Sequence, residues 1–393
     1  MARRPRRRAA LVVVVVGTLV AVGIGVFAAA RSGDSDPPGI RRPAGRPIHL
    51  VPEGIVADCS KPVDGELNDW LASVPDGATV RFRPDACYAQ QQRLVLKNRT
   101  DLVVDGDGAT FRSSAPNDNS KLVPNWFLMR SDRITIRDMT IVGNFDDPGP
   151  PTPNRGSVTS NAGVGIYGGT DVEVSDVTIR HVFGDGVTVA NAYYHDPEDP
   201  THEFSRNVRL RRLDVRKAAR HCVSPSQVTG FWLEDSKLDD CYLDGVDAEK
   251  DLLTDPLSDL HFLRNAFSNY FGVGLVIPIG GMAGAAPVDG IEIRDNRFTT
   301  LPTASVCNQA IAIGSYESQT FSNVVIEGNE ILSWKVAIAV RGVTSGRIHD
   351  NVVTHPTRGP GGGDPPRVGD CGPEQEANVV TRDSPNVSVE GND

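Results

Sequence analysis

The chain has 393 residues, of which 39 are Gly, 28 are Pro and only 6% are aromatic. Enough apolar residues remain to form a core, so this composition excludes collagen, a coiled coil and a wholly disordered chain. The formal net charge of −10 also counts against nucleic acid as a partner, because phosphate binding requires a basic surface.

Residues 1–30 are predicted to be a signal peptide or an N-terminal membrane anchor. Five arginines precede an uncharged run from Ala9 to Ala30, a pattern that inserts a chain with its N-terminus inside. The run is about long enough to span a bilayer, whereas its three closing alanines offer a cleavage site, so both interpretations stay open. Either one places the rest of the chain outside the cytoplasm, secreted or anchored, with membrane contact only through residues 9–30.

The charge changes sign after this segment. Residues 1–46 carry nine Lys and Arg against two Asp and Glu, and the remainder carries 31 basic and 48 acidic residues, a net charge of −17. Residues 31–50 lack periodicity and are expected to form a flexible linker. Residues 51–100 are expected to form the N-terminal cap and the entry to the main fold. The acidic remainder disfavours a polyanionic partner, which it would repel.

Six cysteines in an exported chain predict disulfides rather than a metal site. Cys59 and Cys87 bracket one short segment and are the preferred pair. The pairing of the other four stays open: Cys222 and Cys241 lie close in sequence, and Cys307 and Cys371 flank loops. No CxxC is present and the histidines are scattered, so a structural zinc site is not expected.

Residues 101–393 repeat one pattern, with apolar residues at positions 0, 2 and 7 of each copy. Successive copies begin at Ile134, Val172, Val208, Phe231, Leu260, Ile291, Val324, Gly346 and Val387. A second short apolar stretch follows most of the first ones. Period-2 alternation, frequent Gly and almost no helical periodicity indicate strands. A minimum repeat of 22 residues supplies about three short strands per coil, which predicts a parallel β-helix whose coils bury their apolar faces against each other.

A column of asparagines supports a common coil. Position 5 is Asn in five copies: Asn265, Asn296, Asn329, Asn351 and Asn392. Stacked Asn side chains can hydrogen-bond to each other along a column of turns, where backbone groups would otherwise be unpaired.

With these repeats, the segment DCSKPVDGELNDWLASVPDGATVRFRPDACY and the line TDLVVDGDGATFRSS, the chain resembles the right-handed parallel β-helix proteins of the pectate-lyase-like superfamily. The resemblance covers roughly residues 55–393 and implies an all-β, single-stranded right-handed parallel β-helix with an N-terminal capping helix. We expect that helix around Leu67, Trp70 and Leu71, with Asp64 as its N-cap. The superfamily contains lyases, hydrolases, epimerases and adhesins without enzymatic activity, so the fold leaves the reaction open.

Three acidic or basic side chains fall at one position of successive copies. Asp185, His221 and Asp244 each lie six residues after the position-7 apolar residue. If the coils stack without insertion, these side chains follow each other at about 4.8 Å per coil, and Asp185 and Asp244 are roughly 9–10 Å apart. That separation suits an inverting glycosidase, and Asp247 could supply a second carboxylate on a single coil. The alternative interpretation is that Asp185, Asp244 and Asp247 only form or solubilise turns and that His221 is a surface histidine.

The strings FGDGV, ARHCVS and LDGVD are similar to those of the polygalacturonase-like hydrolases. This resemblance implies an acidic role for Asp185 and the role of the coil histidine for His221, whereas Asp244 has no clear counterpart. The chain lacks the Asn-Thr-Asp, Asp-Asp and Arg-Ile-Lys patterns of that group, which leaves open both the reaction and the binding of a uronate carboxylate.

Nearby residues predict how a polysaccharide would be held. Arg220 and Lys250 could bind an acidic sugar or act as a base in β-elimination, and the loop aromatics Tyr193 and Tyr194 could stack on sugar rings. They could equally balance local charge and pack their own loop. No cofactor is expected; calcium would suit the Asp-rich turns, but no calcium-loop spacing is present.

The sequence therefore predicts a monomeric extracytoplasmic protein that acts on polysaccharide along the side of a β-helix. Hydrolysis of glycosidic bonds is the leading hypothesis. The alternatives are a polysaccharide lyase and a glycan-binding or cell-surface protein without catalytic activity.

Overall fold

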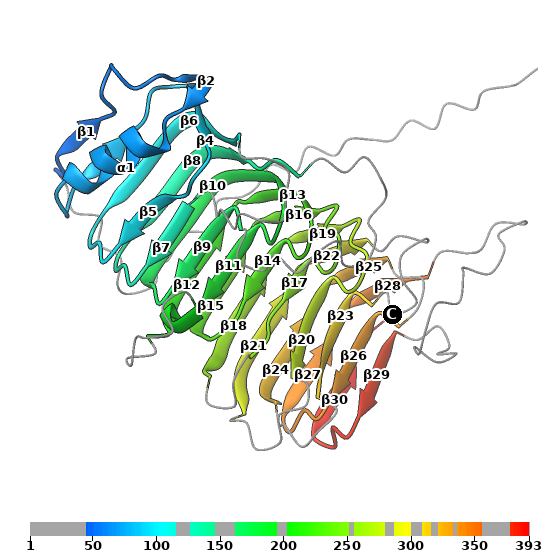
Figure 1. Ribbon diagram of the computed structural model, residues 1–393. Coiled ribbons are helices and arrows are strands. Elements are labelled where there is room, and N and C mark those ends of the chain that lie inside the picture. Colours follow the sequence, from blue (N-terminus) through cyan, green and yellow to red (C-terminus); the bar gives the residue numbers. More distant parts are fainter. Residues whose placement is uncertain are drawn as a thin grey trace, which may run out of the picture. The chain divides into compact units, whose positions relative to one another are not determined.

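The repeated apolar residues form strands that stack on their counterparts in neighbouring coils, and every strand pair in the described part of the chain is parallel (Figure 1). The computed structural model describes residues 45–114, 126–145, 162–194, 203–250, 255–279, 287–299, 309–315, 321–332, 336–355 and 378–392. These residues form a right-handed parallel β-helix, as the sequence predicted.

Each complete coil contributes two strands, or one long strand, to a 20-stranded sheet, here called sheet A, and one strand to a 10-stranded sheet, sheet B. Sheet B contains β5 (Leu94–Lys97), β7 (Trp126–Met129), β9 (Val164–Tyr167), β11 (Val187–Ala190), β14 (Val223–Pro225), β17 (Val246–Asp247), β20 (Leu275–Ile279), β23 (Ile311–Ser315), β26 (Ile338–Arg341) and β29 (Val379–Arg382).

Sheet A has two columns of strands. The first contains β1 (Ile48–Leu50), β3 (Thr79–Arg81), β6 (Val103–Ser113), β8 (Thr135–Val142), β10 (Thr170–Val182), β12 (Ser205–Arg211), β15 (Val228–Glu234), β18 (Leu257–Leu263), β21 (Val288–Arg294), β24 (Phe321–Glu327), β27 (Gly346–His349) and β30 (Val387–Glu390). The second contains β2 (Asp58–Pro62), β4 (Cys87–Gln90), β13 (Asp214–Ala218), β16 (Lys237–Asp239), β19 (Ala266–Ser268), β22 (Arg297–Thr299), β25 (Glu330–Leu332) and β28 (Val352–Thr354). Strands β6, β8 and β10 run through both columns, because β6 pairs with β3 and β4, and β10 pairs with β12 and β13.

The register confirms the predicted repeat. Val172 pairs with Val208, which pairs with Phe231, and the chain of pairs continues to Val387 without a slip. The position-7 residues pair in the same way, from Ile141 and Ile179 onward. A one-residue slip would turn these apolar side chains to solvent, so burial of one face fixes the register.

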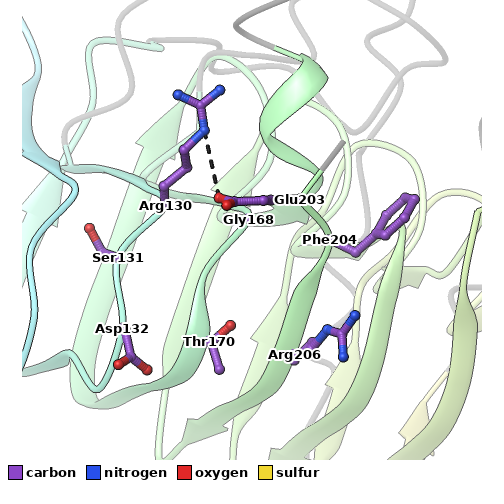
Figure 2. A pocket seen from close by; sticks show the side chains of 8 residues that line it. All are labelled: Arg130, Ser131, Asp132, Gly168, Thr170, Glu203, Phe204 and Arg206. Atoms are coloured by element: carbon purple, nitrogen blue, oxygen red, sulfur yellow. Dashed lines mark ion pairs between the residues drawn. The ribbon is translucent and has the colours of Figure 1, made fainter. Parts of the chain in front are cut away.

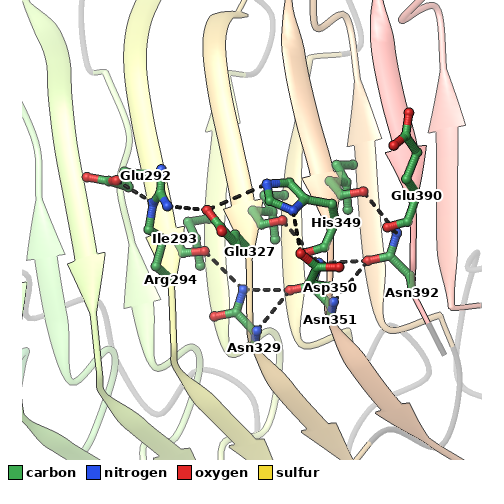
Figure 3. Close-up of polar contacts among 12 residues, drawn as sticks. Glu292, Ile293, Arg294, Glu327, Asn329, His349, Asp350, Asn351, Glu390 and Asn392 are labelled. Carbon is green, nitrogen blue, oxygen red and sulfur yellow. Dashed lines mark hydrogen bonds and ion pairs between the residues drawn. The ribbon is translucent and has the colours of Figure 1, made fainter.

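The predicted asparagine column is present, and all its members except the half-buried Asn392 are buried. Figure 3 shows its end, from Asn329 to Asn392. In each step the side-chain amide of one Asn donates to the Oδ1 of the next, at 2.8–3.0 Å from Asn265 to Asn392. The same Oδ1 accepts the backbone N–H of the preceding Asn, for example Asn296 N to Asn329 Oδ1 at 2.9 Å. The column therefore pairs backbone groups at the turn between the two strands of sheet A.

The single described α-helix, α1 (Asp64–Ser73), buries Leu67, Trp70 and Leu71 as predicted. The prediction that Asp64 is its N-cap is wrong, because Val63 holds that position without a side-chain bond. Asp64 instead accepts the backbone N–H of Gln91 at 2.8 Å. The described unit also begins before residue 51, since β1 (Ile48–Leu50), expected in the linker, pairs with β3.

Two disulfides join the described cysteines. Cys59 is bonded to Cys87, as predicted, and Cys222 to Cys241, with Cα atoms 5.0 and 5.6 Å apart. Cys307 and Cys371, the expected export segment 1–30 and linker residues 31–44 lie outside the described residues. Within the described residues, no helix is long and apolar enough to cross a membrane.

Candidate functional site

Asp185, His221 and Asp244 come from three successive coils and occupy the same position in each. Each lies two residues before a strand of sheet B, and those strands, β11, β14 and β17, pair in register. Backbone hydrogen bonds join the three turns directly: Gly186 N donates to His221 O at 3.0 Å, and Cys222 N donates to Asp244 O at 3.2 Å. The fold thus sets the spacing of the three side chains through the spacing of its coils.

The His221 imidazole lies between two carboxylates and is only 3% exposed. Its Nδ1 is 3.3 Å from Asp244 Oδ2, and its Nε2 is 3.2 Å from Asp247 Oδ2. Burial by itself lowers the pKa of His221, but the hydrogen bond with Asp244 and the charges of Asp247 and Asp185 outweigh it and raise that pKa to about 9. At neutral pH this histidine is therefore a cation held by two acids.

Asp247 reaches His221 from within β17. Because side chains alternate along a strand and Val246 lies in the core, Asp247 points to the outer face of sheet B. It is only 7% exposed, and its Oδ1 is buried with no hydrogen-bond partner among the described residues. Burial raises the pKa of Asp247 to about 7, although the charge of His221 lowers it. A carboxyl group in this state can keep a proton near neutral pH.

Asp185 is bound on all sides and has 1% of its surface exposed. It accepts hydrogen bonds from Thr188 Oγ1 at 3.1 Å, from Arg220 Nη1 at 3.2 Å and from the backbone N–H of His221 at 3.2 Å. These three donors occupy both of its oxygens. Asp185 therefore fixes the turn that carries Arg220 and His221.

Each nitrogen of the His221 ring faces both a donor and an acceptor. Nδ1 faces the backbone N–H of Asp244 at 3.4 Å and its Oδ2, and Nε2 faces Arg220 Nη2 at 3.2 Å and Asp247 Oδ2. A protonated nitrogen pairs with the carboxylate, and an unprotonated nitrogen accepts from the N–H group. The site thus accommodates His221 with or without its second proton, as a proton relay requires.

The donor types of His221, Asp244 and Asp247 also suit a metal ion, and one ligand atom of each lies within 4.8 Å of the others. Their arrangement fits a metal poorly. The two carboxylates approach opposite nitrogens of the ring, of which one ion can bind only one, and the Arg220 cation lies beside Nε2. The arrangement favours a proton over a metal cation.

The other predicted residues lie at varying distances from this centre. Lys250 is buried three residues after Asp247, and burial lowers its pKa. Tyr193 lies in the short helix η1 (Ala192–Tyr194), which follows β11 and so lies at the opposite end of that strand from Asp185. Nothing is described of the Tyr194 side chain.

Two contacts of the site were not predicted from the sequence. Thr188, which bonds Asp185, is the outward residue of β11, so period-2 alternation could have found it. The backbone N–H of Val273, which donates to Asp244 Oδ1 at 2.6 Å, depends on a turn conformation that no side-chain pattern reports.

The described residues thus define a right-handed parallel β-helix with a buried Asp–His–Asp cluster at one edge of sheet B. The chain is similar in fold to the Agl-KA catalytic domain, with a TM-score of 0.59 and 13% identity over 90% of this chain. It is also similar to endo-xylogalacturonan hydrolase from Aspergillus tubingensis (0.51, 14%), with 87% of this chain and 93% of that one covered. A third similar fold is that of an exopolygalacturonase from Thermotoga maritima, with a TM-score of 0.50 and 13% identity, covering 80% of this chain and 88% of that one.

The chain spans 57% of the length of the Agl-KA catalytic domain. No protein-family model matches the sequence, and no curated protein is significantly similar to it. At these identities the likeness shows the fold.

Proposed function

We propose that this protein hydrolyses glycosidic bonds of a polysaccharide at the edge of sheet B that precedes β11, β14 and β17. The observation that carries the proposal is Asp247, a buried acid that has one oxygen against His221 and the other without a partner. The similar folds of the endo-xylogalacturonan hydrolase and the exopolygalacturonase support the choice of substrate class.

In this mechanism Asp247 is the general acid. With its pKa raised to about 7, it holds a proton at neutral pH and presents Oδ1 to the leaving glycosidic oxygen. His221 Nε2, 3.2 Å from the other oxygen, holds the Asp247 carboxylate in place after its proton has left. Positioned proton transfer of this kind contributes about 10²–10⁴-fold to the rate.

Asp244 is the second carboxylate. It is 16% exposed and held by Val273 N and His221 Nδ1. One oxygen of Asp244 lies within 4.8 Å of one oxygen of Asp247, close to the roughly 5 Å of a retaining pair and short of the roughly 6.5–9.5 Å that leaves room for water in an inverting pair. Asp244 therefore attacks the anomeric carbon as Asp247 protonates the leaving oxygen, and Asp247 then deprotonates the water that releases the sugar.

This assignment gives Asp185 a positioning role, since its oxygens are taken by Thr188, Arg220 and the His221 backbone. The pair considered from sequence, Asp185 and Asp244 with a water between them, would invert the anomeric configuration. The anomeric configuration of the product therefore distinguishes the Asp244–Asp247 pair, which retains it, from the Asp185–Asp244 pair, which inverts it.

The test is a panel of plant, fungal and bacterial polysaccharides incubated with the protein and assayed for reducing ends, with the first-formed anomer followed by NMR. We expect reducing ends with retained configuration, and a loss of about 10²–10⁴-fold in Asp247→Asn. The control is Asp289→Asn, which changes an exposed aspartate of β21. Inversion would overturn the Asp244–Asp247 assignment, and a wild-type protein that releases no reducing ends from any polysaccharide would overturn hydrolysis.

A lyase is the second candidate, because burial lowers the pKa of Lys250 on the Asp247 coil, and such a lysine can act as the base of a β-elimination. Its product would be unsaturated and absorb in the ultraviolet. Binding without turnover would instead identify a glycan-binding protein.

The same proposal places the protein outside the cytoplasm. The two disulfides support this location, because such bonds persist in oxidising compartments.

A further inference from the structure

A pocket of about 540 Å³ lies at the edge of sheet B opposite the Asp–His–Asp cluster. Its lining residues come directly after β7 and β9 and at the start of β10 and β12, whereas the cluster precedes β11, β14 and β17. They are Arg130, Ser131, Asp132, Gly168, Thr170, Glu203, Phe204 and Arg206 (Figure 2). The volume is within the range of small-molecule sites.

One side of the pocket is a row of three polar side chains from successive coils. Asp132 pairs with Thr170, and Thr170 pairs with Arg206, so the row is roughly 9–10 Å long. Figure 2 shows the three side by side. Asp132 is also paired with Arg133.

Arg206 and Phe204 have no side-chain partner among the described residues. Arg206 is exposed, and within the described part of the chain it has neither an ion pair nor a side-chain hydrogen bond. The Phe204 ring is half-buried and stacks on no aromatic ring or cation among the described residues. The pocket therefore offers a cation and an aromatic ring two residues apart in sequence, at the start of β12 (Ser205–Arg211).

The opposite side of the pocket contains an ion pair and a glycine. Arg130 Nε is 3.6 Å from Glu203 Oε2, so these two charges offset each other. Gly168 has φ +64°, and a Cβ there would lie 2.9 Å from Glu203 O. Arg130 has a left-handed φ of 48°, as do turn residues elsewhere in the coils, such as Arg133 and Arg212.

We propose that this pocket binds a sugar residue that carries a carboxylate. Arg206 pairs with the anion, the sugar ring stacks on Phe204, and Thr170 and Asp132 take hydroxyl groups. The net negative charge of the chain does not prevent the binding of a carboxylate, because charges more than about 8 Å away are largely screened at physiological salt. This inference takes one element from the proposed function, namely that the ligand is a polysaccharide. A four-residue strand of sheet B, roughly 13 Å, separates the pocket from the cluster, so the pocket holds the chain beside the point of cleavage.

The test uses the full chain with Asp247→Asn, which stops the proposed turnover, and isothermal titration calorimetry. The probes are trigalacturonate, trimannuronate and a hyaluronan tetrasaccharide, each paired with its carboxyl-reduced form. We expect at least one acidic probe to bind about tenfold more tightly than its reduced form. Arg206→Gln should abolish this preference, Arg206→Lys should retain part of it, and Phe204→Ala should weaken both forms alike.

Arg297→Gln is the matched control, since Arg297 is an exposed arginine of β22 without an ion pair in the structure. It should leave every affinity unchanged. The proposal is overturned if no acidic probe binds more tightly than its reduced form, or if Arg206→Gln leaves the preference intact in a protein of unchanged Tm. Because binding is measured in the Asp247→Asn protein, a failure here is independent of a failure to hydrolyse.

Discussion

The proton on His221 should make the stability of the β-helix depend on pH. A histidine whose pKa is raised in the folded state stabilises that state fully below its unfolded pKa, about 6.5, and the contribution is lost as the pH rises through the folded value, about 9. Asp247, whose pKa is raised from 3.8 to about 7, destabilises the folded state as the pH rises between those two values, mostly below the range in which His221 acts. The window from pH 7 to 9.5 therefore reports mainly on His221.

The size of the effect follows from the shift. From the usual 6.5 to about 9, the raised pKa corresponds to about 3 kcal/mol, at about 1.4 kcal/mol for each pKa unit. The compact unit Arg46–Asp393 has about 350 residues, for which the unfolding entropy is about 0.7 kcal/mol/K. The Tm should then fall by about 4 °C across the window because of this one group.

The measurement is thermal unfolding followed by circular dichroism between pH 6 and 9.5. The reference is His221→Gln combined with Asp247→Asn, because removing His221 alone would leave Asp247 to titrate in the same range. The wild-type Tm should fall by about 4 °C more than that of the double variant. His261→Gln, which removes an imidazole from the outer face of β18, should keep the wild-type slope. Equal slopes in the wild type and the double variant would refute the assignment of a buried imidazolium.

Three further substitutions test the scaffold. Asn296→Ala removes an amide that donates to Phe262 O and Asn329 Oδ1 and should lower the free energy of unfolding by about 2–4 kcal/mol, measured in urea. An effect as small as that of exposed Asn386→Ala would contradict the column. Gly186→Ala places a Cβ 2.3 Å from Val215 Cγ1 and 2.5 Å from Cys222 O, so its Tm should fall by several degrees, whereas Gly54→Ala, which meets nothing within 4 Å, should not change it. Replacing Cys222 and Cys241 by Ala opens a loop of 19 residues, which should cost about 3 kcal/mol and reduce hydrolysis through the neighbouring His221; unchanged activity would show that the crosslink does not position the site.

The sequence predicted most of the coil geometry because few interactions decide it. Period-2 alternation fixes which face of a strand is buried, and the spacing of Ile134, Val172 and Val208 then sets the register. The asparagine column was predictable for the same reason, since an Asn at the same turn of successive coils lies within reach of its counterparts. Cys59 and Cys87 were paired correctly because no other cysteine lies near them in sequence.

The site was less predictable because it depends on turns. Counting positions placed Asp185, His221 and Asp244 in one column, but their hydrogen bonds depend on where each turn directs its side chain. Asp247 belongs to another column, on the outer face of β17, and its contact with His221 crosses between strand and turn. The same limit applies to the Arg130 side of the pocket, whose backbone is left-handed.

Because the coils stack one on the next, the number of coils can change without altering the Asp–His–Asp cluster. The Asp–His–Asp cluster draws on β10 to β17 and on the turn before β20, and each coil contacts only the coils beside it. The coils from β21 onward therefore support the cluster without shaping it. A coil gained or lost there would change how far the protein reaches along a polymer and leave the cluster itself unaltered.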